Sequence, residues 1–143
     1  MPSSICLRYN ISMNLAAVSV STKDLTTSVE FYKILGFEFE KFSDTDEHVE
    51  SINGDGIKLM IDTESMVKSI LGIKPTPSNH SQFAILYDSP AEVNERTELL
   101  TSKGFDVMKQ PWDAFWGQRY AVVKDPNGYL VDVYAYLPKA KPV

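Results

Sequence analysis

Residues 18–37 read Val-Ser-Val-Ser-Thr-Lys-Asp-Leu-Thr-Thr-Ser-Val-Glu-Phe-Tyr-Lys-Ile-Leu-Gly-Phe, and this stretch decides the fold. Its first residues alternate between apolar and polar, which predicts a half-buried strand over 15–21. Asp24 is a good helix N-cap, and Gly36 supplies the left-handed residue that ends many helices. Apolar side chains recur at helical spacing between them: Leu25, Val29, Tyr32 and Leu35. The stretch therefore predicts a strand followed directly by a helix.

The same order of elements occurs twice in the chain. Alternating segments at 37–42, 47–52 and 56–61 predict three strands after the first helix. A Pro- and Ser-rich connector follows, in which 63–72 fits a short helix. The second half then predicts a strand, a capped helix and three strands: 82–87, 90–103, 105–109, 118–124 and 129–136. The repeated unit is about 70 residues long and occurs only twice, which indicates an internal duplication rather than a solenoid.

The expected fold is α+β, with two tandem βαβββ modules whose curved mixed sheets enclose a cavity. We assign the modules to 14–62 and 81–137, joined by the connector 63–80, as one domain over 14–137. Residues 1–13 form a predicted N-terminal arm and 138–143 a tail. In each strand the larger aliphatic side chains should face a helix, which leaves a mixed set for a ligand: Ala17, Ser19, Lys58, Met60, Gln82, Ala84, Leu130, Asp132, Tyr134 and Tyr136.

Length, charge and cysteine content exclude several classes of protein. The 143 residues predict one compact domain, and a net charge of −5 argues against nucleic acid or an anionic membrane as a partner. No apolar run has the roughly 18 residues of a membrane span. Cys6 is the only cysteine, so an intrachain disulfide and a zinc site built from cysteines are impossible. We therefore expect a cytoplasmic protein.

An aromatic segment gives the densest local signal, Gln110-Pro111-Trp112-Asp113-Ala114-Phe115-Trp116-Gly117-Gln118-Arg119-Tyr120. The aromatic rings beside one arginine suit a planar or anionic ligand. The same segment equally suits a loop that packs as a lid over the core. The four residues Asp125-Pro126-Asn127-Gly128 that follow fit a type I turn between two strands.

Taken in order, these segments resemble the glyoxalase/bleomycin resistance/dioxygenase superfamily, also called vicinal oxygen chelate (VOC) proteins. The resemblance covers about residues 14–137 and rests on Val18–Ser21, Lys23–Tyr32, Leu35–Phe37, Phe115–Tyr120 and Asp125–Gly128. It implies paired βαβββ modules around a shared cavity. In catalytic members, four side chains drawn from His, Gln and Glu hold a divalent metal that chelates two substrate oxygens.

The positions that match this metal site are Ala17, Met60, Gln82 and Asp132. Alanine has no donor atom, and a thioether is a poor ligand for a hard or borderline cation. The resemblance therefore implies no standard metal site. We expect the two histidines, His48 and His80, to be a surface strand residue and a loop residue.

The main hypothesis is a metal-free protein that binds a small aromatic or amphipathic molecule, such as an antibiotic. Apolar walls would come from Trp112, Phe115, Trp116, Tyr134 and Tyr136, and orienting polar groups from Gln82, Arg119 and Asp132. Two of these residues have a structural alternative. For Asp132 it is acceptance of a tyrosine hydroxyl or pairing with Lys58, and for Arg119 it is pairing with Asp113 or Asp125.

Two alternatives stay open. One is a divalent-metal lyase or isomerase of the lactoylglutathione lyase kind, or a dioxygenase, which would use Gln82 and Asp132 with a compensating ligand; Asp132 is its catalytic candidate. The other is an interaction module without a small ligand. We expect a homodimer, because proteins of the family that this chain resembles often complete their cavities across a two-fold axis.

Overall fold

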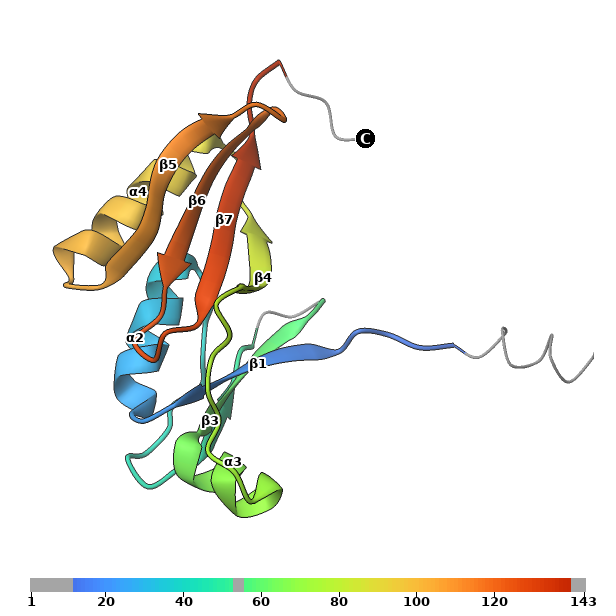
Figure 1. Cartoon of the computed structure of the whole chain (residues 1–143), viewed down its shortest axis with the longest axis vertical. Coiled ribbons are helices and arrows are strands. Elements are labelled where there is room, and N and C mark those ends of the chain that lie inside the picture. The colour runs from blue at the N-terminus through green and yellow to red at the C-terminus, as the bar shows by residue number, and fades with distance from the viewer. Residues whose placement is uncertain (1–11, 53–55, 140–143) are drawn as a thin grey trace, which may run out of the picture.

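The computed structural model describes residues 12–52 and 56–139. Its elements, in chain order, are β1 (Ala17–Thr22), α2 (Leu25–Leu35), β2 (His48–Glu50), β3 (Lys58–Thr63), α3 (Glu64–Leu71), β4 (Ser81–Leu86), α4 (Pro90–Ser102), β5 (Asp106–Ala114), β6 (Gln118–Lys124) and β7 (Leu130–Tyr136). They form a 3-stranded sheet and a 4-stranded sheet (Figure 1). The α+β class and the two mixed sheets are confirmed. The second sheet has the four strands of the expected βαβββ module, and the first sheet has three.

The first sheet has the order β1-β3-β2, with β1 parallel and β2 antiparallel to β3. The expected strand at 37–42 is wrong: this segment keeps only an isolated bridge between Phe39 and Ser51. Next to the bridge, the amide of Ile52 donates to the carbonyl of Glu38 at 2.9 Å. Phe39 and Phe42 pack against the core, so their apolar pattern reflects burial without a continuous strand partner.

The second sheet has the order β4-β7-β6-β5, with β4 parallel to β7 and the other pairs antiparallel. The strand expected at 105–109 continues to Ala114, so Trp112 lies in β5 rather than in a loop. Pro111 is tolerated because β5 is an edge strand and its register against β6 shifts between Lys109 and Trp112. The segment 110–118 is therefore part of a β-hairpin.

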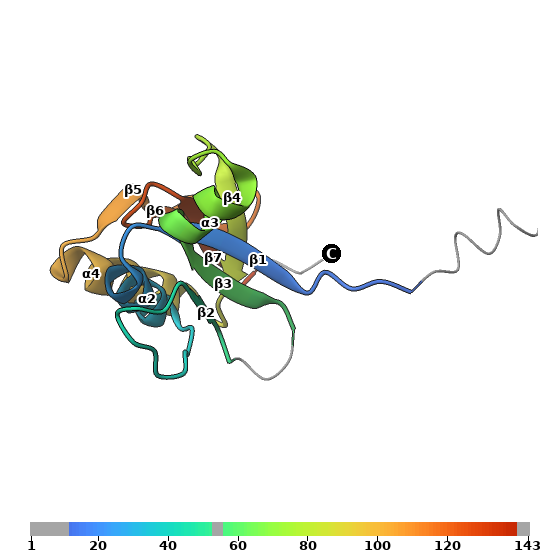
Figure 2. The same ribbon diagram turned by 90° about the horizontal axis from the view of Figure 1, so that it is seen from below.

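The two modules share one hydrophobic core instead of facing each other across a cavity. In this core the Tyr32 ring stacks on Phe83 and the Phe31 ring meets Phe105 edge-on, with centroid distances of 6.4 and 5.3 Å. Helices α2 and α4 lie side by side over this core (Figures 1 and 2). The expected enclosure of a cavity by the two sheets is thus wrong for the described part of one chain, because the sheets do not close on one another.

The predicted turn at 125–128 ties the modules together by hydrogen bonds. Buried Asp125 accepts from the Tyr32 hydroxyl at 2.7 Å. The Asn127 amide donates to the hydroxyls of Thr22 and Ser28 at 3.0 and 3.2 Å. The Asp-Pro-Asn-Gly turn is therefore a connection between modules as well as a link between β6 and β7.

The predicted helix in the connector is present as α3, and none of its side chains is fully buried. Residues 1–11 of the predicted arm and 140–143 of the tail lie outside the described residues. In the described ranges, no helix is both long and apolar enough to cross a membrane.

Candidate functional site

A row of aromatic rings crosses the open side of the second sheet. Strand register places Trp112 opposite Tyr120 and Tyr120 opposite Tyr134. The Trp112 and Tyr120 rings meet edge-on at 5.6 Å, the Tyr120 and Tyr134 rings stack at 5.5 Å with planes 23° apart, and Tyr136 follows at 6.1 Å. Helix α4 packs on the opposite side of the sheet, and among the described residues no helix covers these rings.

The tip of the β5–β6 hairpin extends this row. The Trp116 ring lies 5.5 Å from Tyr120 and 6.0 Å from Trp112, and its indole N–H donates to Gln118 at 2.8 Å. Phe115 packs edge-on against Trp116 but is 96% exposed. We call the surface formed by Trp112, Trp116, Tyr120, Tyr134 and Tyr136 the aromatic face. It presents large, half-buried rings to solvent, which suits a planar or apolar ligand.

Asp132 lies in the middle of the aromatic face, and each of its carboxylate oxygens accepts one hydrogen bond. The Tyr120 hydroxyl donates to its Oδ2 at 2.5 Å, and the Ser81 hydroxyl donates to its Oδ1. Desolvation raises the pKa of the Tyr120 hydroxyl well above its usual value, and the Asp132 carboxylate raises that pKa further. Tyr120 therefore keeps its proton and acts as a donor. The structural alternative for Asp132 holds, with Tyr120 rather than Lys58 as the partner.

Gln82 lies at an irregularity in β4. The register against β7 shifts between Ser81 and Phe83, as in a β-bulge, so Gln82 has no paired residue. The side chain of Gln82 accepts a long hydrogen bond of 3.4 Å from Ser78 in the connector. The bulge thus brings Ser81, and not Gln82, to Asp132.

Arg119 does not join the aromatic face. It lies next to Tyr120 in β6, so its side chain points to the opposite side of the sheet. There Nε donates to Asn94 of α4 and Nη1 to Asp113, both at 3.1 Å. The expected grouping of Arg119 with Gln82 and Asp132 is corrected accordingly, and the alternative pairing with Asp113 is the one observed.

The four positions of the family's metal site fall on two sheets. Val18, Val20, Leu59 and Ile61 face the core, so Ala17 and Met60 take the open side of the first sheet. Gln82 and Asp132 belong to the second sheet, and both oxygens of Asp132 accept hydroxyl hydrogen bonds. In the ranges 12–52 and 56–139, no group of three or more His, Cys, Asp or Glu side chains is arranged to hold a metal.

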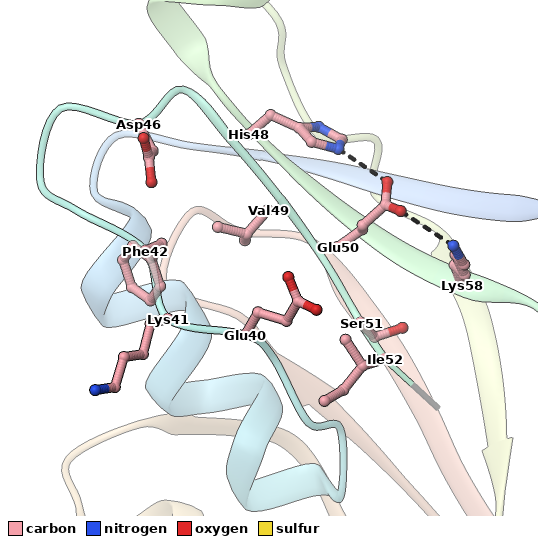
Figure 3. A pocket seen from close by; sticks show the side chains of 10 residues that line it. All are labelled: Glu40, Lys41, Phe42, Asp46, His48, Val49, Glu50, Ser51, Ile52 and Lys58. Atoms are coloured by element: carbon pink, nitrogen blue, oxygen red, sulfur yellow. Dashed lines mark hydrogen bonds and ion pairs between the residues drawn. The ribbon is translucent and has the colours of Figure 1, made fainter. Parts of the chain in front are cut away.

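A second polar cluster lies on the first sheet beside a hollow of about 560 Å³ (Figure 3). His48 Nδ1 lies 2.5 Å from Asp62 Oδ1, and His48 Nε2 lies 3.1 Å from Glu50. Lys58 also pairs with Glu50, at 3.1 Å. The hydrogen bond to Asp62 raises the pKa of His48, against the opposing effect of partial burial. His48 is a surface strand residue as expected, and His80 is an exposed residue immediately before β4.

Sequence reasoning missed Ser81, and it counted Tyr120 among the rings of the aromatic segment without including it in the predicted ligand site. Tyr120 could have been assigned to that site, because side-chain alternation puts it on the face opposite to Arg119 and therefore on the same face as Tyr134 across the hairpin. Ser81 could not, because its contact with Asp132 depends on the bulge at Gln82, and nothing in the sequence marks that bulge.

The chain matches one family model when it is compared with known protein families. A family model described as the Glyoxalase/Bleomycin resistance protein/Dioxygenase superfamily matches residues 14–133. No curated protein sequence matches the chain significantly.

Several solved structures described as glyoxalase-type proteins have a similar fold. A glyoxalase/bleomycin resistance protein/dioxygenase from Nocardioides has 20% identity and a TM-score of 0.68, covering 100% of this chain and 98% of its own. A glyoxalase-related enzyme from Fulvimarina pelagi has 18% identity and a TM-score of 0.74, covering 87% and 88%. A lactoylglutathione lyase from Agrobacterium tumefaciens has 17% identity and a TM-score of 0.64, covering 87% and 94%. At these identities the likeness shows the fold alone.

Proposed function

Because this chain belongs to the glyoxalase/bleomycin resistance protein/dioxygenase superfamily, we propose that it binds a small planar or amphipathic molecule on the aromatic face, without a resident metal. The observation that carries the proposal is the continuous row of rings from Trp112 to Tyr136 with one carboxylate at its centre. Aromatic rings bury large areas and prefer stacked or edge-on partners, so a flat apolar ligand is the natural occupant.

The polar groups of the face would orient such a ligand. The hydroxyls of Tyr120 and Ser81 donate their protons in hydrogen bonds to Asp132. The remaining lone pairs of these hydroxyl and carboxylate oxygens can therefore accept hydrogen bonds from a ligand at the centre of the face. The Lys109 ammonium lies 4.8 Å from the centre of the Trp112 ring and adds a cation at one edge. A ligand with a flat apolar body and a hydrogen-bond donor fits this arrangement best.

Tryptophan fluorescence tests the proposal directly, because both tryptophans of the chain belong to the aromatic face. We expect planar probes, such as flavone and acridine, to quench this fluorescence with saturation. Replacing the ring in Tyr134→Ala should weaken binding roughly twofold to tenfold, since an aromatic pair contributes about 0.5–1.5 kcal/mol beyond its buried area.

Ile57→Ala is the matched control, because Ile57 lies immediately before β3, outside the aromatic face, and is 44% exposed. Its affinity for the probes should equal that of the wild type. Equal weakening by both variants would contradict the proposed site. A complete lack of binding would favour the interaction-module hypothesis instead.

The metal-dependent alternative requires metal ligands that two of the four matching positions do not provide. Ala17 offers no donor atom and Met60 only a thioether, so these residues do not fit the family's four-ligand site. Metal analysis of the purified protein is the discriminating measurement: stoichiometric zinc, nickel, manganese or iron that is lost in Gln82→Ala or Asp132→Ala would contradict the proposal.

A homodimer in the cytoplasm is the proposed form of the protein. Within residues 12–52 and 56–139 the two sheets share a core and supply no wall over the aromatic face, and a second copy would supply one. The single cysteine, Cys6, supports a reducing compartment, because no disulfide is available within the chain.

A further inference from the structure

A groove runs along α2 on the helix-covered side of the molecule, away from the aromatic face. Its main part is a hollow of about 570 Å³ between α2 and α4, a volume within the range of small-molecule sites. A smaller hollow of about 330 Å³ continues it and shares Val29, Lys33 and Phe42 with it. We call the two together the α2–α4 groove.

The groove combines apolar side chains with an excess of positive charge. Val29, Ile34, Phe42 and Leu99 supply apolar surface, and Leu99 is 42% exposed. The cations along both hollows are Lys33, Lys41, Arg96 and Lys103, against the carboxylates of Glu30 and Glu40. In a chain with 14 basic and 19 acidic residues, this local excess of cations reverses the overall balance of charge.

Arg96 is held in place before any ligand arrives. Its Nη1 donates to the carbonyl of Ile34 at 3.0 Å, and its guanidinium carbon lies 5.8 Å from the centre of the Tyr87 ring. Within 12–52 and 56–139, this is the one hydrogen bond of the guanidinium, so further N–H donors remain for an anion. A fixed guanidinium loses little side-chain entropy when it binds a carboxylate.

We propose that the α2–α4 groove is a second binding site, which takes an amphipathic anion: a small molecule with one carboxylate and an apolar chain. The carboxylate pairs with Lys33, Lys103 and Arg96, and the chain lies over Leu99 and Phe42. This site is independent of the aromatic face, because the second sheet separates the two.

Titration calorimetry with dodecanoate below its micelle concentration tests the proposal. We expect saturable binding of one equivalent. The variant Lys33→Gln/Lys103→Gln should raise Kd about tenfold or more, because each lysine contributes a charge-assisted contact. Both side chains are exposed, so this variant keeps the fold, which thermal unfolding verifies. Tryptophan fluorescence should stay unchanged, since both tryptophans lie on the aromatic face.

Two comparisons make the test selective. Lys68→Gln removes an exposed lysine of α3 outside the groove and should leave Kd unchanged. Dodecyltrimethylammonium has the same chain with the opposite charge and should bind far more weakly. The proposal is overturned if dodecanoate shows no saturable binding at millimolar concentration, or if the double variant binds it as tightly as the wild type. Binding that quenches tryptophan fluorescence would assign dodecanoate to the aromatic face and also overturn the proposal.

Discussion

The hydroxyl of Tyr32 satisfies a carboxylate that the protein buries between its modules. Asp125 is 2% exposed, and burial raises its pKa although Tyr32 and nearby backbone amides donate to it. Removing this donor in Tyr32→Phe should lower the free energy of unfolding by about 1.5–3 kcal/mol, as for hydrogen bonds to charged groups. Urea unfolding measures the loss. Tyr136→Phe, on the half-buried aromatic face, should change stability by less than about 0.5 kcal/mol; a similar loss in both variants would contradict this role.

His48 should make stability depend on pH in a defined direction. Its pKa is raised in the folded protein, mainly by the hydrogen bond to Asp62, so the protonated form is favoured by folding. This contribution is fully present below the ordinary value of 6.5 and is lost as the pH rises through the higher folded pKa. Because the side chain is 40% exposed, the gain is at most about 1 kcal/mol. Comparing wild type and His48→Gln by urea unfolding at pH 5.5 and 8.5 should give a larger difference at the lower pH; an equal or larger difference at pH 8.5 would contradict the prediction.

At the level of single residues, side-chain alternation predicted the correct face wherever it was applied to a strand. It correctly predicted that Asp132 and Tyr134 lie on the face away from the core. Applied to β6, the same rule places Arg119 and Tyr120 on opposite faces of the sheet. The prediction treated the aromatic segment as one unit and therefore put Arg119 on the ligand side. The hydrogen bond from Ser81 to Asp132 depends on a bulge in another strand and had no local signal.

The end of α2 depends on one glycine. Gly36 is the C-cap of α2 and has φ +117°. Its amide donates to the carbonyl of Lys33. An added Cβ would meet nothing within 4 Å, so a substitution costs only the backbone strain. Gly36→Ala should therefore destabilise the protein by about 1–2 kcal/mol. Thermal unfolding should show a smaller loss for Gly36→Asn, because asparagine tolerates the left-handed region; an equal loss would point to a steric cause.

Among the elements, helices were predicted better than strands because their ends carry local chemistry. Asp24 and Ser89 cap α2 and α4 as expected, with side chains that accept from backbone amides within the first turn. The segment 37–42 has the alternation of a strand but leaves the sheet after one bridge. Alternation reports which side chains are buried, whereas a strand also needs a backbone partner, which the local sequence does not specify.

For the whole molecule, the duplication was visible in the sequence but the packing of the two modules was not. The repeated Gly-Phe pairs at 36–37 and 104–105 mark equivalent helix ends in both modules. Whether two such modules join through their open faces or through their helix sides depends on contacts distant in sequence, such as Tyr32 with Asp125 and Phe83. The helix-side core leaves both open faces without a cover from residues 12–52 and 56–139.

This uncovered surface leads to the prediction of a dimer. Besides the aromatic face, the end of α3 presents Ile70, Leu71 and Ile73 at 70%, 63% and 67% exposure, an unusual group of apolar side chains for a monomer. Sedimentation should give twice the monomer mass of 16.1 kDa. Leu71→Asp/Ile73→Asp should shift the equilibrium toward the monomer without loss of the fold, because neither side chain belongs to the core. Lys68→Gln on the same helix should leave the dimer intact, and a 16.1 kDa species for the wild type at every concentration would contradict the prediction.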